Sequence, residues 1–519
     1  MRKILALLLS LFTVCGVSAC AYNFDFLKSA SDSESSSDGG SSDIWTDGGC
    51  VDQDQNDVCD DCGASVAVTF DVISVNDLHG KLADGDSHPG ADELTTYIKQ
   101  TRAQNENTIV LSTGDMWQGA AESNLTKGFI MTEWMNELDF VSMTMGNHEY
   151  DWGESYIEAN AELAEFPFLA INIYDRDTNA RVEYCRPSVM VEQSGVKIGV
   201  IGAIGDCYSS IAGDKVEDVY FKTGSQLTEL VKAEANKLKN AGADCIIYTI
   251  HDGYSNAAYD TTLSDGYVDL VLEGHSHQTY ARIDEHGVYH LQGGGDNKGV
   301  SHAKLSVNYV NDTARTTQAK VVYASTYKNL ASDPLVDELL EKYADQIALA
   351  GKVLGTNAHI RYSDEILDDC AALYLVAGEE RWGSKYDLVL GGGFMSARAP
   401  YNLQAGEVTY GDLQNILPFD NQLVLCSIKG KELREKFIET DNSRYHISLS
   451  EYGASIRNNI DDNAVYYLIT DTYSSTYAPN KLTEIERYDE NVFARDLLAE
   501  YIERGGYELV ATPWNEDGE

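Results

Sequence analysis

Basic residues are scarce in this sequence. Of its 519 residues 38 are Lys or Arg, against 83 Asp and Glu, so the formal net charge is −45. A field of that sign repels polyphosphate backbones and anionic lipid headgroups, which argues against a nucleic-acid polymer as the partner. An anionic small substrate would require a local reversal of the field, by metal ions or by a few arginines.

Two other features are missing. After the N-terminal segment, no stretch is long and apolar enough to cross a membrane, and the ten cysteines do not form the dense framework of a small disulfide-rich domain. Hydrophobic residues nevertheless make up 43% of the chain and aromatic residues 10%, which excludes a wholly disordered protein. The length predicts two or three domains.

The N-terminus is typical of a secreted protein. Residues 1–19 begin with MRK and continue as a short apolar stretch, which predicts a signal peptide. The letters VSAC, ending at Cys20, resemble a bacterial lipobox and predict lipidation of Cys20. The alternative is a plain signal peptide followed by a chance cysteine. Residues 20–65, Ser/Asp/Gly-rich over 28–49, then form a tether to the outer face of the cell membrane, or to the periplasm if an outer membrane is present.

The end of this tether, residues 50–63, is rich in cysteine and aspartate (CVDQDQNDVCDDCG). Asp52, Asp54 and Asn56 have the alternating spacing of a calcium loop. However, Asp57 stands where such a loop needs glycine, and Gly63 where it needs glutamate. A small calcium-binding or cysteine-stapled knot is one prediction, and a solvated acidic linker, which we favour, is the other.

From Val66 onward, five apolar runs each end on polar residues. These residues are Asp77 with His79, Asp115, Asn147 with His148, His251, and His275 with His277. The carboxyl ends of strands are where α/β sheets place their sites. Each cluster alone is explained equally well by a turn or a core histidine. Together they indicate a mixed carboxylate, imidazole and amide set that suits zinc, manganese or iron, with enough ligands for two ions.

These motifs resemble a known family. DLHG, STGDMWQG, GNHEYDWG, His251 and GHSH match in order the calcineurin-like metallophosphoesterase core of the 5′-nucleotidase family, and GEVTYGDLQNILPFDNQLV is similar to the signature of its second domain. The resemblance implies an α/β protein: an N-terminal metallophosphoesterase β-sandwich flanked by helices (66–330), joined to a smaller mixed α/β substrate-recognition domain (352–513). Helical periodicity over 333–350 predicts a joining helix within the linker 331–351.

The resemblance also implies roles for the motif residues. One ion, zinc or manganese, is held by Asp77, His79, Asp115 and His277. The second is held by Asp115, Asn147, His251 and His275, so that Asp115 is the bridge. His148 matches the catalytic histidine, and Asp151 matches the carboxylate that orients it.

In the second domain the resemblance is less complete. Phe419 matches an aromatic that stacks on the base, with a core aromatic as the alternative, and Asn421 matches a base-contacting amide. Where the family reads NGGGIR this chain has LGGGFMSAR, which displaces the arginine by three positions to Arg398. Where the family has an aromatic followed by GGDG, this chain has TDTYSSTYAPNKL, in which Tyr473 is the candidate for the second aromatic face.

The leading prediction is an extracellular, lipid-anchored enzyme that hydrolyses nucleotides to nucleoside and phosphate. The same metals would serve a 2′,3′-cyclic nucleotide phosphodiesterase with 3′-nucleotidase activity, or a nucleotide-sugar hydrolase. A non-catalytic surface binding protein or adhesin is the alternative of another class. The complete ligand set from Asp77 to His277 argues against it.

Overall fold

The computed structural model describes residues 50–505 apart from 55, 85–88, 254–258, 312, 399–401, 478–481 and 490–491. The predicted signal peptide, Cys20 and the Ser/Asp/Gly-rich stretch therefore lie outside the described residues. Residues 50–519 form one unit, separate from residues 1–49, and all that follows belongs to it. Among the described helices, none has the length and apolar character that crossing a membrane requires.

Two six-stranded sheets form the first half of the described unit. The first has the order β14-β13-β1-β2-β3-β4 and the second β11-β12-β10-β9-β7-β6. β1, β2, β3 and β4 are parallel neighbours, as are β7, β9, β10 and β12. The bounds are β1 Ala67–Val75, β2 Thr108–Ser112, β3 Ser142–Thr144, β4 Phe168–Leu169, β6 Ser188–Gln193, β7 Val196–Ile204, β9 Cys245–His251, β10 Leu270–Glu273, β11 Thr279–Ile283, β12 Tyr289–Gly293, β13 Gly299–Asn308 and β14 Thr313–Tyr323.

The two sheets pack face to face and share a core of aliphatic side chains. In β1, Phe70 and Val72 belong to this inner core, whereas Ile73 and Val75 belong to the core on the opposite face. This is the period-two alternation that a strand imposes on its side chains. From the second sheet, Ile198 completes the inner layer.

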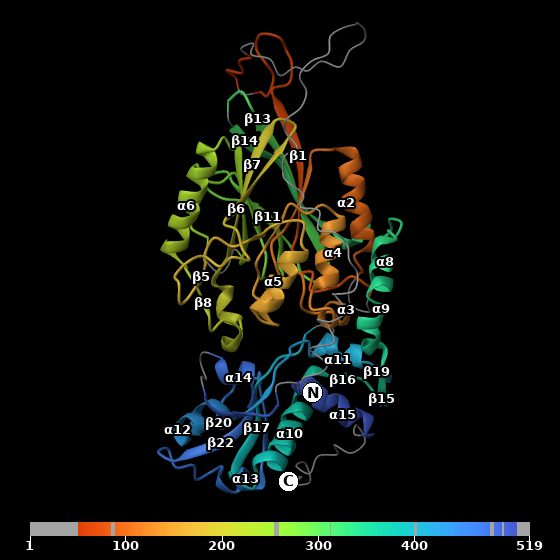
Figure 1. Ribbon diagram of the computed structural model, residues 1–519, viewed down its shortest axis with the longest axis vertical. Coiled ribbons are helices and arrows are strands. Elements are labelled where there is room, and N and C mark those ends of the chain that lie inside the picture. The colour runs from red at the N-terminus through yellow and green to blue at the C-terminus, as the bar shows by residue number, and fades with distance from the viewer. Residues whose placement is uncertain are drawn as a thin grey trace, which may run out of the picture. The chain divides into compact units, whose positions relative to one another are not determined.

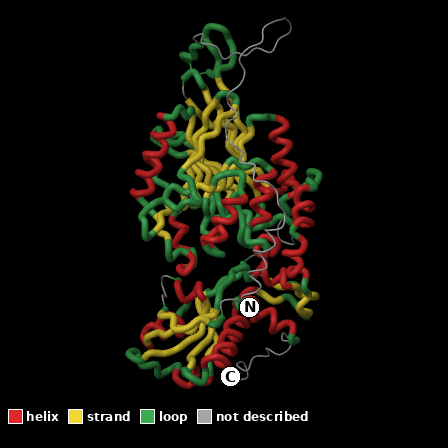
Figure 2. Tube along the Cα trace, viewed as in Figure 1, coloured by secondary structure: helices red, strands yellow, loops and turns green. Residues whose placement is uncertain are grey.

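Helices cover both outer faces of the sandwich (Figure 1). α2 (Asp92–Gln104) and α4 (Phe129–Glu137) pack on the first sheet, and α6 (Ser225–Asn240) packs on the second. Figure 2 shows the strands in the middle with helices outside them. The other α-helices described here are α3 Ala121–Leu125, α5 Glu154–Leu163 and α7 Ala324–Tyr327, and a small pair of strands is formed by β5 Ile173–Asp175 and β8 Val219–Phe221. The predicted flanked β-sandwich is confirmed.

The connector to the second half is helical, but it is not the single helix predicted over 333–350. α8 (Leu335–Lys342) is followed by α9 (Ala344–Ile347) and by a 3-10 turn over Ala348–Gly351. The break falls at Tyr343, whose φ of −97° and ψ of 9° leave the α-helical region. The domain boundaries stay a prediction, because residues 50–519 form one compact unit.

The second half is a mixed five-stranded sheet of order β21-β17-β22-β20-β23, with α10 packed on β17 and β22. Its bounds are β17 Leu388–Phe394, β20 Leu423–Lys429, β21 Tyr445–Leu449, β22 Val465–Asp471, β23 Thr483–Arg487, α10 Ser363–Trp382, α11 Tyr410–Ile416, α12 Gly430–Leu433, α13 Glu451–Ile456, α14 Thr472–Thr476 and α15 Ala494–Glu503. Two small ribbons complete it, β15 Val353–Asn357 with β19 Gly406–Thr409 and β16 Arg361–Tyr362 with β18 Asn402–Leu403.

Candidate active site

The five polar clusters follow neighbouring strands of the two sheets. Asp77, Asp115 and Asn147 come after β1, β2 and β3, which are adjacent in the first sheet. His251 is the last residue of β9 and His275 follows β10, its neighbour in the second sheet. Because the strands of each set are parallel, their carboxyl ends lie at one edge, and the Thr113 hydroxyl donates across the sheets to the Glu273 carbonyl (3.0 Å).

The backbone is left-handed at most of the predicted metal ligands. The φ values lie between +50° and +68° at Asp77, His79, Asp115, His275 and His277. Residues other than glycine adopt this conformation at a cost of about 1–3 kcal/mol each, and such residues cluster where a side chain must be aimed at a site. The surrounding fold holds five such conformations together, which is expected of a site and not of five ordinary turns.

The first ligand group consists of Asp77, His79 and His277. His79 Nε2 lies 3.1 Å from His277 Nε2, and His277 Nε2 lies 3.4 Å from Asp77 Oδ1. His79 Nδ1 is 2.8 Å from the carbonyl of Gln118, an acceptor, so Nδ1 carries the proton and Nε2 presents a lone pair. A carboxylate and imidazole nitrogens therefore face one point, and this arrangement fits a divalent cation.

The second group consists of Asp115, Asn147, His251 and His275. His251 Nδ1 donates to the Thr113 carbonyl (2.5 Å), so its Nε2 is a lone-pair donor. That Nε2 lies 3.1 Å from Asp115 Oδ2 yet makes no well-aligned hydrogen bond, although the side chain is fully buried. His275 Nδ1 lies 3.0 Å from Asn147 Oδ1. A buried ring nitrogen that lacks a hydrogen-bond partner and lies beside a carboxylate fits the role of a metal ligand.

Asp115 joins the two groups. Ligand atoms of Asp77, Asp115 and His251 all lie within 4.8 Å of one another. One Asp115 oxygen also accepts a hydrogen bond from the backbone N–H of His148 (2.9 Å). A Cβ on Gly146 would collide with the same oxygen, so the approach of this loop to Asp115 requires glycine there.

The electrostatics at His79 and Asp115 favour the protonation states that a cation requires, whereas at His251 the Asp115 charge outweighs burial and raises the pKa to about 10. Burial lowers the pKa of His79 well below its usual value, and the nearby Arg398 adds to this effect. Burial alone would raise the pKa of Asp115, but His251 and His148 outweigh it and hold that pKa well below its usual range. A neutral imidazole and an ionised carboxylate are the ligand forms that bind metals.

His148 lies beside the metal groups and is held by a carboxylate. Its Nδ1 is 2.8 Å from Asp151 Oδ2, and its ring centroid is 5.5 Å from that of His79. Because Asp151 engages Nδ1, Nε2 is the nitrogen left for a substrate. Both residues line the cavity described below.

Sequence reasoning missed Glu149, the residue next to His148. It is fully buried, and its carboxylate accepts from the backbone N–H groups of Asp115 (2.9 Å), Met116 (2.9 Å) and Gly146 (2.8 Å). Burial and then the Asp115 charge raise the pKa of Glu149 to about 7. It fixes the loops after β2 and β3 against each other. The signal available in the sequence was its place inside the GNHEYDWG motif.

A cavity of about 290 Å³ extends from the metal groups to the five-stranded sheet. Asn147, His148, Asp151 and His275 line it from the sandwich side. All four predicted substrate-binding residues line it from the other side, namely Arg398, Phe419, Asn421 and Tyr473. The structure thus brings two of the predicted metal ligands, Asn147 and His275, and all four predicted substrate residues to one cavity.

Phe419 and Arg398 lie next to the catalytic histidine. The half-buried Phe419 ring is 5.9 Å from the ring of His148, and the Arg398 guanidinium is 5.7 Å from the Phe419 centroid. Arg398 is also close enough to His79 to add to the lowering of its pKa by burial, and close enough to His277 to oppose the rise in pKa that the Asp77 charge causes there. Although it is displaced by three positions in the sequence, this arginine therefore lies beside the metal groups.

Phe394 is a second residue that sequence reasoning missed. It lines the cavity and stacks on Tyr477, with centroids 4.1 Å apart and planes inclined by 7°. The Tyr473 ring lies 6.1 Å from Phe394 and 5.9 Å from Tyr477. Phe394 is the phenylalanine of LGGGFMSAR, a segment in which the resemblance implied a role only for the arginine.

The loop that carries Phe419 is held by buried charges. Arg495 donates to the carbonyls of Leu417 (3.0 Å) and Phe419 (3.2 Å) and to Asp420 Oδ1 (2.6 Å). The other Asp420 oxygen pairs with Lys127, from the sandwich half, at 2.5 Å. Both sides of the cavity are connected through this carboxylate.

Comparisons with known proteins agree with this architecture. Residues 71–279 match the model of the calcineurin-like phosphoesterases, and residues 353–464 match the 5′-nucleotidase C-terminal domain. The chain is 26% identical to protein UshA of Yersinia enterocolitica, over 84% of this chain and 91% of that protein. It is 24% identical to the 5′-nucleotidase of Vibrio cholerae, over 70% and 74% respectively.

Among solved structures, the 5′-nucleotidase precursor of Thermus thermophilus has the same fold, with a TM-score of 0.66, 18% identity and coverage of 85% of this chain and 97% of that one. The two family matches together span more than half of the sequence and contain every predicted metal ligand. The chain therefore belongs to the two-domain calcineurin-like metallophosphoesterases of the 5′-nucleotidase family, whose members are metal-dependent phosphoester hydrolases that use two divalent ions.

Proposed function

We propose that this chain is a two-metal phosphoesterase that hydrolyses nucleotides to nucleoside and phosphate on the outer side of the cell membrane. One observation supports it most strongly. Asn147 and His275 of the second metal group line the same cavity as the aromatic and amide side chains of the second half, so a phosphate and the base attached to it can bind at opposite sides of one cavity. The 5′-nucleotidase names of the relatives support the same substrate class.

The two ligand groups hold the ions in this proposal. Asp77, His79 and His277 would hold the first ion, Asn147, His251 and His275 would hold the second, and Asp115 would be shared by both. Two divalent ions, zinc or manganese, would polarise the phosphoryl oxygens, lower the pKa of an attacking water and offset charge as phosphorus is attacked. They would also supply the local positive charge that a chain of net charge −45 needs.

His148 acts on the phosphate ester itself. Asp151 holds its Nδ1, so that Nε2 is the ring nitrogen directed at the substrate. In that position the imidazolium stabilises negative charge in the transition state and donates a proton to the departing alkoxide. Arg398, beside the metal groups, is placed to pair with a phosphate oxygen.

The nucleoside half binds between the aromatic residues of the second domain. Phe419 and Tyr473 line one cavity, and in the described residues their rings make no contact with each other, which is compatible with a base inserted between them. Stacking contributes about 1–3 kcal/mol per base and tolerates any base. Asn421 supplies a donor and an acceptor at the rim of the base.

A phosphate-release screen tests the substrate class. The probes are 5′- and 3′-mononucleotides, nucleoside diphosphates, 2′,3′-cyclic nucleotides, nucleotide sugars and a small aryl phosphate, with zinc or manganese added and His148→Ala as the matched inactive control. The proposal expects 5′-mononucleotides to have the highest kcat/KM. A preference for cyclic nucleotides or nucleotide sugars would select the corresponding alternative hydrolase, and no turnover of any ester would favour a binding protein.

A further inference from the structure

Residues 50–66 apart from 55, which precede β1, form a folded segment that we call the lobe. Asp60 N donates to Val51 O (2.7 Å), Cys59 N to Ala64 O (2.8 Å) and Gly63 N to Cys59 O (2.8 Å). Cys59 is only 2% exposed. The open, solvated linker that we favoured from composition is therefore not what the structure shows, because these backbone groups bond to one another and not to water.

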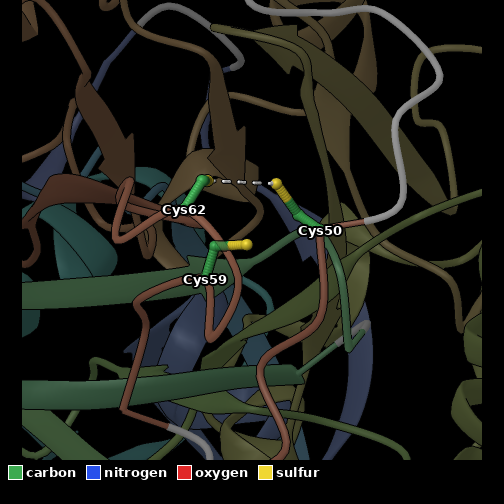
Figure 3. A group of neighbouring side chains, drawn as sticks. All are labelled: Cys50, Cys59 and Cys62. Atoms are coloured by element: carbon green, nitrogen blue, oxygen red, sulfur yellow. Dashed lines mark hydrogen bonds between the residues drawn. The ribbon is translucent and has the colours of Figure 1, made fainter.

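Three cysteine sulfurs converge in this lobe (Figure 3). The Sγ atoms of Cys50, Cys59 and Cys62 all lie within 4.8 Å of one another, and those of Cys50 and Cys62 are 4.0 Å apart. Zinc–sulfur bonds of about 2.3 Å in a tetrahedron separate two sulfurs by about 3.8 Å. A disulfide requires about 2.05 Å and would leave one of the three thiols unpaired. The observed spacing fits a shared ion.

The backbone around Cys59 suits a thiolate ligand. Cys59 and Cys62 are the ends of a Cys-x-x-Cys turn closed by Gly63, whose φ of +73° favours glycine. The backbone N–H groups of Cys62, Asp61 and Val51 are hydrogen-bonded to the Cys59 sulfur, an arrangement that stabilises a thiolate. Three thiolates this close would be stable only around a cation.

We propose that Cys50, Cys59 and Cys62 bind one thiophilic divalent ion, preferentially zinc, with solvent at the fourth tetrahedral position. Cys62 is exposed, so the outer side of the cluster is open to water. This site is separate from the catalytic groups, whose ligands are oxygen and nitrogen atoms.

The carboxylates of the same lobe do not support a calcium site of their own. Asp52, Asp54 and Asp60 gather within 4.8 Å. However, Asp52 already accepts from Asn56 N (3.0 Å) and Asp57 N (3.1 Å) and from the side chain of Asn308 (2.7 Å). Because these hydrogen bonds satisfy the Asp52 oxygens without an ion, they give no support to a calcium ion at this segment.

The ion would fix the point at which the N-terminal segment joins the catalytic body. The lobe is tied to the sandwich through Asp57, which accepts from Ser306 (3.1 Å) and pairs with Arg315, and through the Asp52–Asn308 bond. These bonds involve Asp52 and Asp57 and not Cys50, the first described residue of the lobe. An ion bound by Cys50, Cys59 and Cys62 would fix Cys50 to the rest of the lobe and so restrict the point from which the tether begins.

Cobalt substitution in the full-length chain is the primary test. Cobalt in a thiolate site gives an intense sulfur-to-metal charge-transfer absorption in the near ultraviolet, which oxygen and nitrogen ligands do not produce. The proposal expects this band at one equivalent per chain, lost on adding zinc but not on adding calcium. A reduced chain without the band, or a Cys50–Cys62 disulfide in the protein as secreted, found by non-reducing peptide mass spectrometry, would overturn the proposal.

Substitution adds a second readout. Cys62 is exposed, so Cys62→Ser should fold, and it should hold one ion fewer per chain than the parent and lose the cobalt band. Asp54→Asn, in the same lobe, is the matched control and should keep both. Phosphate release should be unchanged in each variant, and zinc removal should speed protease cleavage between residues 50 and 66. Equal ion content in Cys62→Ser and the parent would count against the site, whatever the result of the phosphatase assay.

Discussion

At the scale of single residues, the active site depends on which ring nitrogen of each histidine the chain already uses. In His79 and His251, Nδ1 donates a hydrogen bond to a backbone carbonyl, so Nε2 is available to an ion. In His148, Nδ1 donates to the Asp151 carboxylate, so Nε2 is available to the substrate. In the proposed function the same type of side chain is therefore a ligand at two places and an acid at a third, because different groups accept its Nδ1 proton.

His148→Ala tests that division of roles. General acid catalysis contributes about 10²–10⁴-fold, so kcat should fall within that range. Metal content should stay at the level of the parent chain, because His148 is not in either ligand group. Steady-state kinetics and metal analysis on the same sample measure both quantities. If the variant loses an ion, His148 belongs to the ligand set and the assignment is wrong.

The motifs identified the residue types but not all of the partners. Asp77, His79 and the other predicted ligands converge as the resemblance implied, because each follows a strand whose neighbours are parallel. Glu149 was not predicted, because its role consists of accepting backbone N–H groups from a different loop. Phe394 was not predicted either, because its contact with Tyr477 depends on how two distant segments pack.

At the scale of elements, Glu149 holds together the loops that follow β2 and β3. Glu149→Gln is isosteric, but its amide has one acceptor oxygen, and its NH₂ group faces backbone donors. Substituting such supporting groups weakens metal affinity or activity by about 10–100-fold. Competition with a chelator measures the affinity, and circular dichroism checks the fold. Unchanged metal affinity in a folded Glu149→Gln variant would show that the hydrogen bonds of Glu149 to these two loops are dispensable for metal binding.

The loop that follows α11 sets the position of Phe419. Arg495 and Asp420 fix its backbone, so Phe419→Ala should remain folded. If the ring stacks on the base, kcat/KM for nucleotides should fall by a factor that corresponds to about 1–3 kcal/mol, mostly because KM rises. The kcat/KM for a small aryl phosphate should stay the same. Tyr473→Ala is the parallel variant for the second face. Equal losses on both substrates would instead assign Phe419 a packing role.

The connector between the two halves is broken at a residue that its sequence pattern does not mark. The periodicity of Leu335 and Leu339 predicted a helix correctly up to Lys342. It did not show the break at Tyr343, whose side chain is buried against the sandwich core. Tertiary packing of one aromatic residue thus divided a segment whose pattern is helical throughout.

At the scale of the whole molecule, the charge of −45 means that an anion needs a local source of positive charge, which bound metal ions would supply at the active site. That restriction favours small phosphate esters over polymers, because only a small ligand can fit a cavity of about 290 Å³ beside the metal groups. The sequence predicts that a lipid on Cys20 retains the whole chain at a membrane.

Cys20→Ser tests the anchor. The diacyl modification expected at Cys20 gives firm membrane retention, whereas a single acyl chain binds only reversibly. The variant should therefore leave the membrane fraction or accumulate unprocessed, and detergent partitioning of the parent and the variant would measure this. Mass spectrometry that finds an unmodified Cys20 in the mature parent chain would contradict the prediction.

The central claim is that two ions bridged by Asp115 hydrolyse nucleotide esters. The most direct measurement is phosphate release from a 5′-mononucleotide by the Cys62→Ser chain, stripped with a chelator and titrated with zinc or manganese, beside the same chain carrying Asp115→Ala. We predict that activity rises to a maximum at two ions per chain, and that the Asp115→Ala chain binds less metal and turns over several orders of magnitude more slowly. Full activity in the metal-free chain, or an Asp115→Ala chain that keeps two ions and near-normal turnover, would contradict it.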